Sequence, residues 1–396
     1  MEWKEVDICQ LCDSVSETYK GNASEVVLIN TSDVHDGKCL NHEYVPNKKL
    51  KGQFKKTFRK GDILYSEIRP ANKRFCFVDF EPKDYIASTK LMVLRAHEDV
   101  DPQYLYQILR SNDTLAQLQM LAESRSGTFP QITYSELSNI MISLPSQKAQ
   151  KNIVSIFSSL DRKIELNNKI NADLEEMAQA IFKNWFVDFE PFKDGKFVDS
   201  ELGMIPEGWK VGTLGDITKN KSAKVKERND VKVLSPVTTG ELVLSEEYFT
   251  KQVFSSSIAK YKIVNKGDFA YNPARVNIGS LGRNEFDFDG CVSPVYVVFS
   301  VLDGYENYFD LFRKTDFFKD SVASLAIGGV RQSLSYDDLS SIEVIIPSEN
   351  AVEEFNNLYN QMKKTIKANK LENSRLSLLR DTLLPRLMSG ELEVPE

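Results

Sequence analysis

The chain has few of the features that would place it in a membrane, outside the cell or around a metal ion. No apolar run approaches the ~18 residues of a membrane span, and residues 1–20 lack the basic and then apolar pattern of a secretory signal. We therefore expect a cytoplasmic protein without a membrane partner. The five cysteines are scattered, and the spacing of Cys9 and Cys12 has no second ligand pair near it. Buried thiols are thus expected in place of a metal or redox centre.

The common signatures of catalysis are lacking too. There is no Walker phosphate loop, no Gly-x-Gly-x-x-Gly after a strand and no Gly-x-Ser-x-Gly, and the three histidines stand apart from one another. The segment Asn272-Pro273-Ala274-Arg275 is similar to the Asn-Pro-Pro-aromatic motif of adenine methyltransferases, but it lacks the second proline and the aromatic residue. These absences predict a chain with no catalytic residues and with no metal or cofactor bound to it.

What the chain has is length and an apolar content typical of folded proteins. Its 396 residues are 41% hydrophobic and 10% aromatic, which predicts two or three domains with sizeable cores. The formal net charge of −7 argues against indiscriminate binding of polyanions, although a net figure does not describe how charge is laid out on a surface.

An internal repeat is the strongest pattern in the sequence. Its copies begin at Trp3 and Trp209, 206 residues apart, and the offset settles near 202 from the pair Gln131 and Gln332 onward. The globular parts therefore vary in their loops, whereas the helices that follow share one length. Further matching pairs are Lys60-Gly61-Asp62 with Lys266-Gly267-Asp268, Tyr65 with Tyr271, Tyr134 with Tyr336, Leu137 with Leu339 and Pro145 with Pro347.

Each copy ends in a long helical stretch whose apolar seam alternates four- and three-residue steps. Two asparagines interrupt each seam, Asn167 and Asn171 in the first copy and Asn369 and Asn373 in the second. Asparagine in such a seam costs stability and is usually kept because it fixes register. The other seam positions are Ile153, Phe157, Leu160, Ile164, Leu174, Ala178, Ile181 and Trp185, and then Phe355, Tyr359, Met362, Ile366, Leu376, Arg380, Leu383 and Leu387.

The asparagines straddle the midpoint of each seam, so an antiparallel pairing in full register brings the four amides together while apolar residues meet along both arms. A parallel pairing would also match the asparagines. It is disfavoured because the second globular part must start near the end of one helix and finish near the start of the next. We expect an intramolecular antiparallel coiled coil, with an ordinary bundle core as the alternative.

Each globular part is expected to mix strands and helices. Strand-like segments lie at 63–65, 75–78, 91–94, 269–271, 295–299 and 342–346, and helical patterns lie at 104–123 and 308–325. The predicted fold class is α+β, with two pseudo-repeated mixed α/β domains joined by two long helices that form an antiparallel coiled coil. The expected segments are a first domain at 1–146, a helix at 147–190, a linker at 191–205, a second domain at 206–347, a helix at 348–390 and a tail at 391–396.

Cationic residues cluster in each globular part. Between Lys48 and Arg74 the first part carries ten Lys and Arg against only Asp62 and Glu67. Such clusters near loops with Asn, Gln and Tyr suit phosphate positioning and base-edge reading, although a single run is more often a solvated face. The candidate DNA contacts are Lys55, Lys56, Arg59, Arg69, Lys73, Arg74 and Gln131, and then Lys221, Lys224, Arg275, Asn277, Arg283, Arg331 and Gln332.

Three motifs resemble those of a known family, the specificity subunits of type I restriction-modification systems, and the repeat extends the resemblance over the whole chain. It implies two target recognition domains that each read half of a split double-stranded DNA sequence, with helical spacers that fix the gap. It also implies docking of two modification subunits, which methylate adenine with S-adenosylmethionine, and of restriction (translocase and nuclease) subunits. The motifs are Asn184-Trp185-Phe186-Val187-Asp188-Phe189-Glu190-Pro191-Phe192, Ser200-Glu201-Leu202-Gly203 with Ile205-Pro206-Glu207-Gly208-Trp209, and Leu384-Pro385-Arg386-Leu387-Met388-Ser389-Gly390-Glu391-Leu392.

Two other classes of protein compete with this interpretation. One is an enzyme with an unrecognised site, and the other is a coiled-coil scaffold whose basic faces bind a different ligand such as RNA. A methyl-transfer assay on the isolated chain separates the first from a specificity subunit. Salt-dependent binding to duplex DNA in preference to single strands separates the second.

Overall fold

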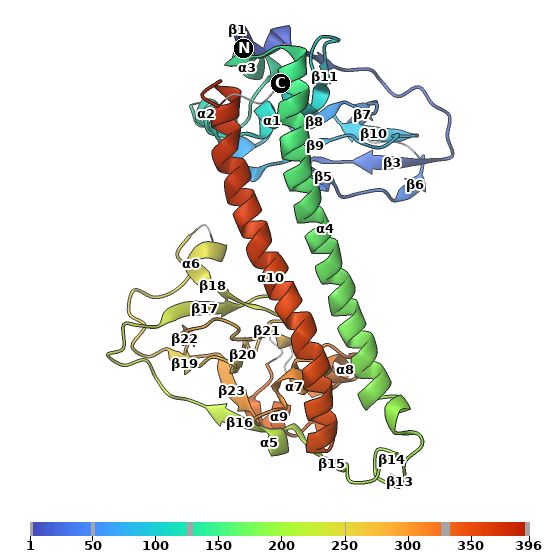
Figure 1. The fold of residues 1–396 in the computed structure, drawn as a ribbon, viewed down its shortest axis with the longest axis vertical. Coiled ribbons are helices and arrows are strands. Elements are labelled where there is room, and N and C mark those ends of the chain that lie inside the picture. Colours follow the sequence, from blue (N-terminus) through green and yellow to red (C-terminus); the bar gives the residue numbers. More distant parts are fainter. Residues whose placement is uncertain (1–2, 49–51, 125–129, 250, 326–332, 393–396) are drawn as a thin grey trace. The chain divides into compact units, whose positions relative to one another are not determined.

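The computed structural model describes residues 3–48, 52–124, 130–249, 251–325 and 333–392. The chain divides into two compact units: unit 1 is Met1–Asn168 with Asn369–Glu396, and unit 2 is Lys169–Ala368. Each unit holds one globular part and half of each of two long helices, α4 (Gln147–Phe186) and α10 (Glu349–Met388) (Figure 1).

Unit 1 is built on two four-stranded sheets. The first is antiparallel with the order β2-β11-β8-β9, and the second has the order β6-β3-β10-β7 with β3 and β10 parallel. The strands are β2 (Cys12–Val15), β11 (Leu91–Ala96), β8 (Ile63–Ser66) and β9 (Phe75–Phe77), and then β6 (Tyr44–Pro46), β3 (Glu25–Ile29), β10 (Tyr85–Ser88) and β7 (Phe54–Lys56).

Alternation along β8 sets the layers of unit 1. Successive side chains of a strand point to opposite faces, so Ile63 and Tyr65 enter a core shared with the helices, whereas Leu64 enters the core between the two sheets. The first sheet is therefore buried on both faces. The remaining elements are β1 (Lys4–Asp7) paired with β12 (Met141–Leu144), the hairpin β4 (Val34–His35) and β5 (Lys38–Cys39), α1 (Pro102–Arg110), α2 (Asn112–Glu123), α3 (Tyr134–Ser138), η1 (Ile8–Gln10), η2 (Thr31–Asp33) and η3 (Pro70–Asn72).

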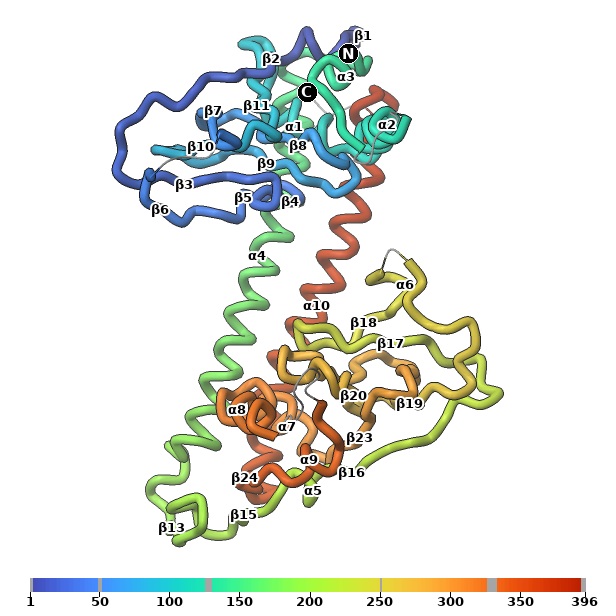
Figure 2. Tube along the Cα trace, turned by 180° about the vertical axis from the view of Figure 1, so that it is seen from behind, coloured from blue at the N-terminus to red at the C-terminus, as the bar shows by residue number. Residues whose placement is uncertain are grey.

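Unit 2 repeats this plan (Figure 2). Its sheets have the orders β16-β23-β20-β21 and β18-β17-β22-β19, with β17 and β22 parallel, and Phe269 and Tyr271 of β20 face the helical core while Ala270 faces the second sheet. The strands are β16 (Thr218–Lys221), β23 (Val297–Val301), β20 (Phe269–Tyr271), β21 (Leu281–Arg283), β18 (Leu242–Leu244), β17 (Lys232–Pro236), β22 (Gly290–Val292) and β19 (Lys262–Val264).

The smaller elements of unit 2 match those of unit 1 as well. β15 pairs with β24 as β1 pairs with β12, and the two ladders are offset by 206 and 202 residues on their two strands. The predicted repeat and fold class are confirmed. These elements are β15 (Lys210–Thr213), β24 (Glu343–Ile346), β13 (Phe197–Val198), β14 (Ile205–Pro206), α5 (Leu214–Ile217), α6 (Ser245–Tyr248), α7 (Glu306–Phe312), α8 (Asp316–Leu325), α9 (Tyr336–Ser340), η4 (Glu190–Phe192) and η5 (Val276–Ile278).

Four sequence-based expectations need correction. The helical stretch 104–123 is two helices, because Ser111 leaves the helical conformation (ψ 147°) and its side chain caps α2 by accepting from the Thr114 amide. The stretch 308–325 is likewise divided into α7 and α8. The strand expected at 295–299 begins only at Val297. The cysteines are not all buried, since Cys9 is exposed.

The two long helices pair antiparallel, as predicted. In unit 1 the Asn167 Nδ2 donates to the Asn373 Oδ1 at 2.9 Å, and in unit 2 the rings of Trp185 and Phe355 lie 6.0 Å apart. Both pairs have residue numbers that add up to 540, which defines the register. All predicted seam positions are buried or half-buried, so the 3.5-residue period identified the packing face.

Arg380 breaks the apolar rule of the seam for a visible reason. Its Nη1 lies 3.0 Å from one oxygen of Asp161, while the Nη1 of Arg110 lies 2.8 Å from the other oxygen. One carboxylate of α4 therefore joins α10 to α1 within unit 1. The aliphatic stem of an arginine can pack in a seam while its head reaches a partner.

Candidate nucleic-acid interface

Two of the predicted arginines, Arg69 and Arg275, lie at the same connection in their respective units. In unit 1 the hairpin β8–β9 is joined through η3, and in unit 2 the hairpin β20–β21 is joined through η5. Arg69 directly precedes η3 and Arg275 directly precedes η5. These two residues are 206 positions apart, both are exposed, and they occupy the same place in the repeated fold. We call the segments 67–74 and 273–280 the hairpin connections.

The hairpin connection of unit 1 is conformationally strained. Arg69 (φ 46°) and Lys73 (φ 51°) both adopt the left-handed conformation on either side of η3. Asp36 (φ 41°) lies beside them, since its amide donates to the Lys73 carbonyl at 2.7 Å. Left-handed non-glycine residues cost about 1 kcal/mol or more each and gather at functional sites. The geometry thus marks this connection as a functional candidate independently of its charge.

The hairpin connection of unit 2 uses glycine for the same turn. Gly279 has φ 93°, and a Cβ there would lie 2.6 Å from the Thr238 carbonyl oxygen. Only glycine combines this backbone conformation with so close an approach. The turn can therefore lie against the β17–β18 turn and leave Asn277 and Ile278 exposed at its tip.

A second segment backs each hairpin connection. The Ile132 amide donates to the Glu67 carbonyl at 2.8 Å, and the Leu334 amide donates to the Pro273 carbonyl at 3.2 Å. These segments follow Gln131 and Gln332 respectively. The Gln131 side chain accepts from the Lys90 ammonium at 3.3 Å. Lys90 is thus an exposed cation beside this connection that was not among the predicted contacts. Arg331 and Gln332 lie outside the described residues.

Several of the predicted contacts bind groups of their own unit, as Lys56, Lys221 and Arg283 show. The Lys56 ammonium donates to the Leu91 carbonyl at 2.7 Å, and burial lowers its pKa. The Lys221 ammonium lies 2.7 Å from Asp268. The Nη1 of Arg283 donates to the Asn307 side chain at 2.9 Å, and its guanidinium lies over the Phe269 ring. These three cations therefore stabilise their own units, and each would have to leave its present partner to bind DNA.

The pair of Lys221 and Asp268 has a counterpart that explains the repeated Lys-Gly-Asp motif. In unit 1 the Asp62 carboxylate, only 1% exposed, accepts two hydrogen bonds of 2.8 Å from Arg95 and one from the Arg59 amide. Asp268 accepts from the Asn265 amide in the same way. Burial raises the pKa of Asp268, although the Lys221 ammonium opposes this. The motif is therefore a structural anchor in both copies.

The other predicted cations differ in their surroundings. Arg74 is half-buried, and its Nη1 lies 3.5 Å from the Thr31 hydroxyl. Lys55 on β7, Arg59 and Lys224 are exposed but lie outside the hairpin connections. Whether each of these cations lies in a hairpin connection could not be predicted from sequence, because all of them lie in stretches of similar composition.

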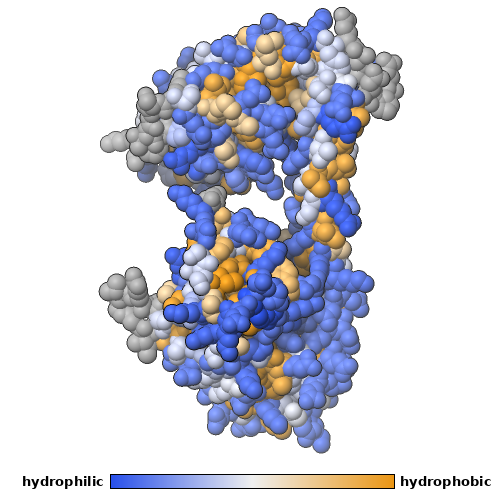
Figure 3. All heavy atoms as spheres, turned by 90° about the vertical axis from the view of Figure 1, so that its left-hand side faces the viewer, coloured by the Kyte–Doolittle hydropathy of each residue, from blue (hydrophilic) through white to orange (hydrophobic). Residues whose placement is uncertain are grey.

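The long helices carry a buried polar centre and an exposed apolar stripe. The Asn167 side chain is 1% exposed and donates to Glu372 (2.7 Å) as well as to Asn373, and Asn171 is also buried. Outside the seam, apolar side chains reach the surface of the helices, and hydrophobic surface is visible along the helical column at the right of Figure 3. These exposed residues are Leu166, Ile170 and Met177 on α4, and Leu358, Leu371, Leu378 and Leu379 on α10.

Within the described ranges, no cluster of three or more His, Cys, Asp or Glu side chains has the geometry of a metal site. None of the helices that these ranges contain is both long and apolar enough to cross a membrane.

Comparison with known proteins gives consistent matches. A family model described as the type I restriction modification DNA specificity domain matches residues 2–176. The HindI specificity subunit of Haemophilus influenzae is 32% identical over 475 aligned positions, which cover 99% of this chain and all of the relative. The MjaIX specificity subunit of Methanocaldococcus jannaschii is 27% identical and covers 89% of this chain and 82% of itself. A solved S subunit from M. genitalium, 16% identical, has a TM-score of 0.57 over 98% of this chain and 96% of its own.

Proposed function

The chain belongs to the family of type I restriction-modification specificity subunits, and from this premise we propose that it reads a bipartite double-stranded DNA target, one half with each globular part. Such subunits are non-catalytic, so methyl transfer and cleavage belong to partner subunits. In this proposal residues 1–146 and 206–347 are the target recognition domains. The segments 147–190 and 348–390 are spacers that set the distance between the two half-sites.

One observation carries the proposal above the others. The two units repeat one topology, and each places an exposed arginine, Arg69 or Arg275, at the same point of its hairpin connection. Arginine is the side chain that most often reads guanine, through two hydrogen bonds in the major groove. A repeated reader suits a target with two separate halves, and it has no evident use in an enzyme with a single site.

The exposed stripe on the long helices supports docking of partner subunits. Ile170 and Met177 on α4, and Leu371 and Leu378 on α10, are seven residues apart in each case, so they lie outside the seam on one face of their helix. Exposed apolar stripes at helical spacing suit packing against the helices of another chain. We assign them to two modification subunits, which hold S-adenosylmethionine, in a cytoplasmic complex that restriction subunits complete.

The most direct test is a domain exchange. Residues 1–145 are replaced by the first domain of another specificity subunit, and N6-methyladenine is located in the host genome by long-read sequencing. The expected result is a methylated motif in which one half changes while the other half and the gap stay the same. A change in both halves would refute modular reading. Methyl transfer by the isolated chain, without modification subunits, would favour the enzyme alternative.

A further inference from the structure

A hollow lies at the same topological position in each unit. In unit 1 it is bounded by the connection from β3 to β6, by the end of η3 and by the junction of α1 and α2, and its volume is about 20 Å³. In unit 2 it is bounded by the turn from β17 to β18, by η5 and by the junction of α7 and α8, and its volume is about 500 Å³. The pair β17 and β18 corresponds to β3 and β6 in the sheet orders, so the two hollows are equivalent.

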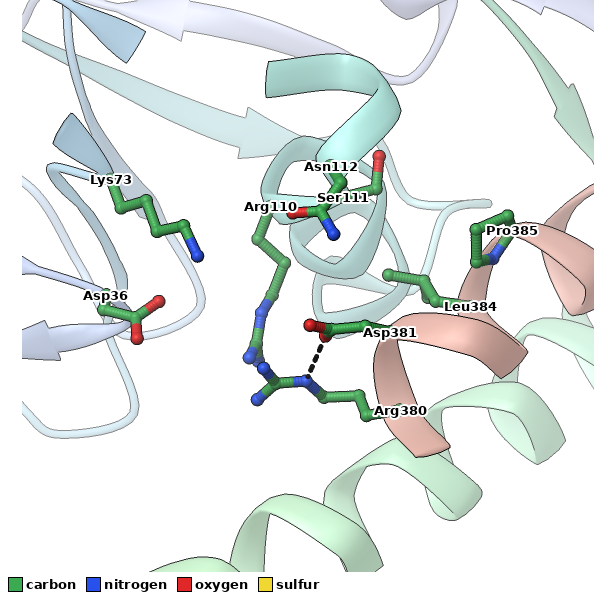
Figure 4. A pocket seen from close by; sticks show the side chains of 9 residues that line it. All are labelled: Asp36, Lys73, Arg110, Ser111, Asn112, Arg380, Asp381, Leu384 and Pro385. Atoms are coloured by element: carbon green, nitrogen blue, oxygen red, sulfur yellow. Dashed lines mark hydrogen bonds and ion pairs between the residues drawn. The ribbon is translucent and has the colours of Figure 1, made fainter. Parts of the chain in front are cut away.

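The hollow of unit 1 is small because α10 closes it. Arg380, Asp381, Leu384 and Pro385 of α10 form its fourth side, opposite Lys73 (Figure 4). The Arg380 guanidinium points toward Arg110, and both arginines are already bound to Asp161 at 3.0 and 2.8 Å. In contrast, the described residues that line the hollow of unit 2 include none from α4 or α10.

The open hollow combines an apolar floor with a cationic rim. Leu281, Phe318 and Val322 are buried in its floor, whereas Lys314 and Lys319 are exposed at its edge. Thr238 from the β17–β18 turn and Asn277 from the hairpin connection also line the hollow. The hollow therefore adjoins the segment that is proposed to read bases.

Three acidic groups near the hollow, Asp310, Asp316 and Glu241, offset part of this charge in different ways. The buried Asp310 is bound by the guanidinium of Arg313 through two hydrogen bonds of 2.9 and 2.6 Å, so this pair is internally balanced. Asp316 lies 3.0 Å from the Lys319 ammonium, but both side chains are mostly exposed. Exposed ion pairs of this kind contribute little to stability, so little is lost when the Lys319 ammonium turns to a phosphate. Glu241 accepts a hydrogen bond from Thr239 at 3.2 Å.

We propose that the hollow of unit 2 seats the sugar–phosphate backbone of the DNA half-site, with Lys314 and Lys319 as phosphate contacts. Phosphate oxygens are contacted by Lys, Thr and Asn side chains, and the apolar face of a deoxyribose suits the floor. The inference rests on the proposed function and adds that the two units differ in how they contact the DNA backbone. Unit 1 has no such seat, because α10 fills the equivalent space, so unit 2 neutralises more phosphates there than unit 1 does.

The test compares the salt dependence of DNA binding by the reconstituted complex with its modification subunits. The variants are wild type, K314A/K319A and the charge-preserving K314R/K319R, and the control is K210A, which removes an exposed lysine of β15. The plot of log K against log salt has a negative slope, and each lost phosphate contact makes this slope shallower by about 0.9. For K314A/K319A we expect a slope shallower by about 1.8, equivalent to roughly a twelvefold smaller loss of affinity over a fourfold rise in salt.

The outcomes separate the two proposals. K314R/K319R and K210A should keep the wild-type slope, and all variants should keep the wild-type preference for the cognate sequence. If K314A/K319A keeps the wild-type slope while the wild-type complex still binds a specific sequence, the proposed phosphate seat is refuted and the proposed function is not. Lost discrimination at one half-site would also overturn the seat, because the lysines would then read bases. Failure of the wild-type complex to prefer any duplex sequence would overturn the proposed function itself.

Discussion

If the paired helices set the gap between the half-sites, lengthening both of them should widen the target. The insertions must face each other for the pairing to survive. Because Asn167 faces Asn373, residues whose numbers add up to 540 face each other, and Ala172 is opposite Ala368. One heptad placed after Ala172 and one placed after Lys367 therefore extend both seams in phase. The amide pair of Asn167 and Asn373 stays intact.

The size of the effect follows from helix and duplex geometry. Seven residues at 1.5 Å per residue lengthen each helix by ~10 Å, which corresponds to roughly three base pairs at ~3.4 Å per pair. Three base pairs also turn one half-site by about 100°, given ~10.5 pairs per turn. The variant should therefore lose the original target and methylate a motif with unchanged halves and a gap about three pairs wider.

The assay is long-read mapping of N6-methyladenine in cells that carry the variant and its modification subunits. A heptad inserted in α4 alone is the matched control, because it moves one arm of the seam out of register and should abolish methylation. A variant that still methylates the original motif would refute the reasoning, since something other than these helices would then measure the gap.

Three further perturbations test the sites. Arg69→Ala and Arg275→Ala should each cost ~1–3 kcal/mol of discrimination at one half-site only, measured as the ratio of affinities for cognate and single-mismatch duplexes; an equal loss for all sequences would make them phosphate contacts. Asp62→Ala should lower the free energy of unfolding by ~3 kcal/mol, because it removes the buried partner of Arg95 and leaves the exposed Glu17 as its ion-pair partner among the described residues. An unchanged urea midpoint would contradict the role of Asp62 as a structural anchor. Replacing Asn167 and Asn373 together by leucine should raise the thermal midpoint by a few degrees, at ~2–4 °C per kcal/mol, since a seam asparagine costs stability; a lower midpoint would show that the amide pair stabilises the coil.

The sequence by itself determined the repeat, the strands of the central sheets and the face of each long helix. Buried positions recur with the period of the helix or strand to which they belong. The seam from Ile153 to Trp185 could therefore be located from the sequence alone. The antiparallel register also followed from sequence, because the asparagines sit at the midpoint of both seams. The break at Ser111 was missed, since a serine can lie inside a helix or cap one, and the two cases differ in backbone conformation and in the side-chain hydrogen bond, here from the Thr114 amide.

Which cations are available to a ligand was decided only by the tertiary structure. Lys55 and Lys56 are adjacent lysines in the same stretch of sequence. Lys55 is exposed, whereas the Lys56 ammonium donates to the carbonyl of Leu91, 35 residues away. The open hollow beside Asn277 and its closed counterpart beside Lys73 differ through Arg380, which is more than 300 residues from Lys73 in the chain. Such pairings join segments that only folding brings together. Composition and periodicity describe residues that are close along the chain, so they do not predict contacts between distant segments.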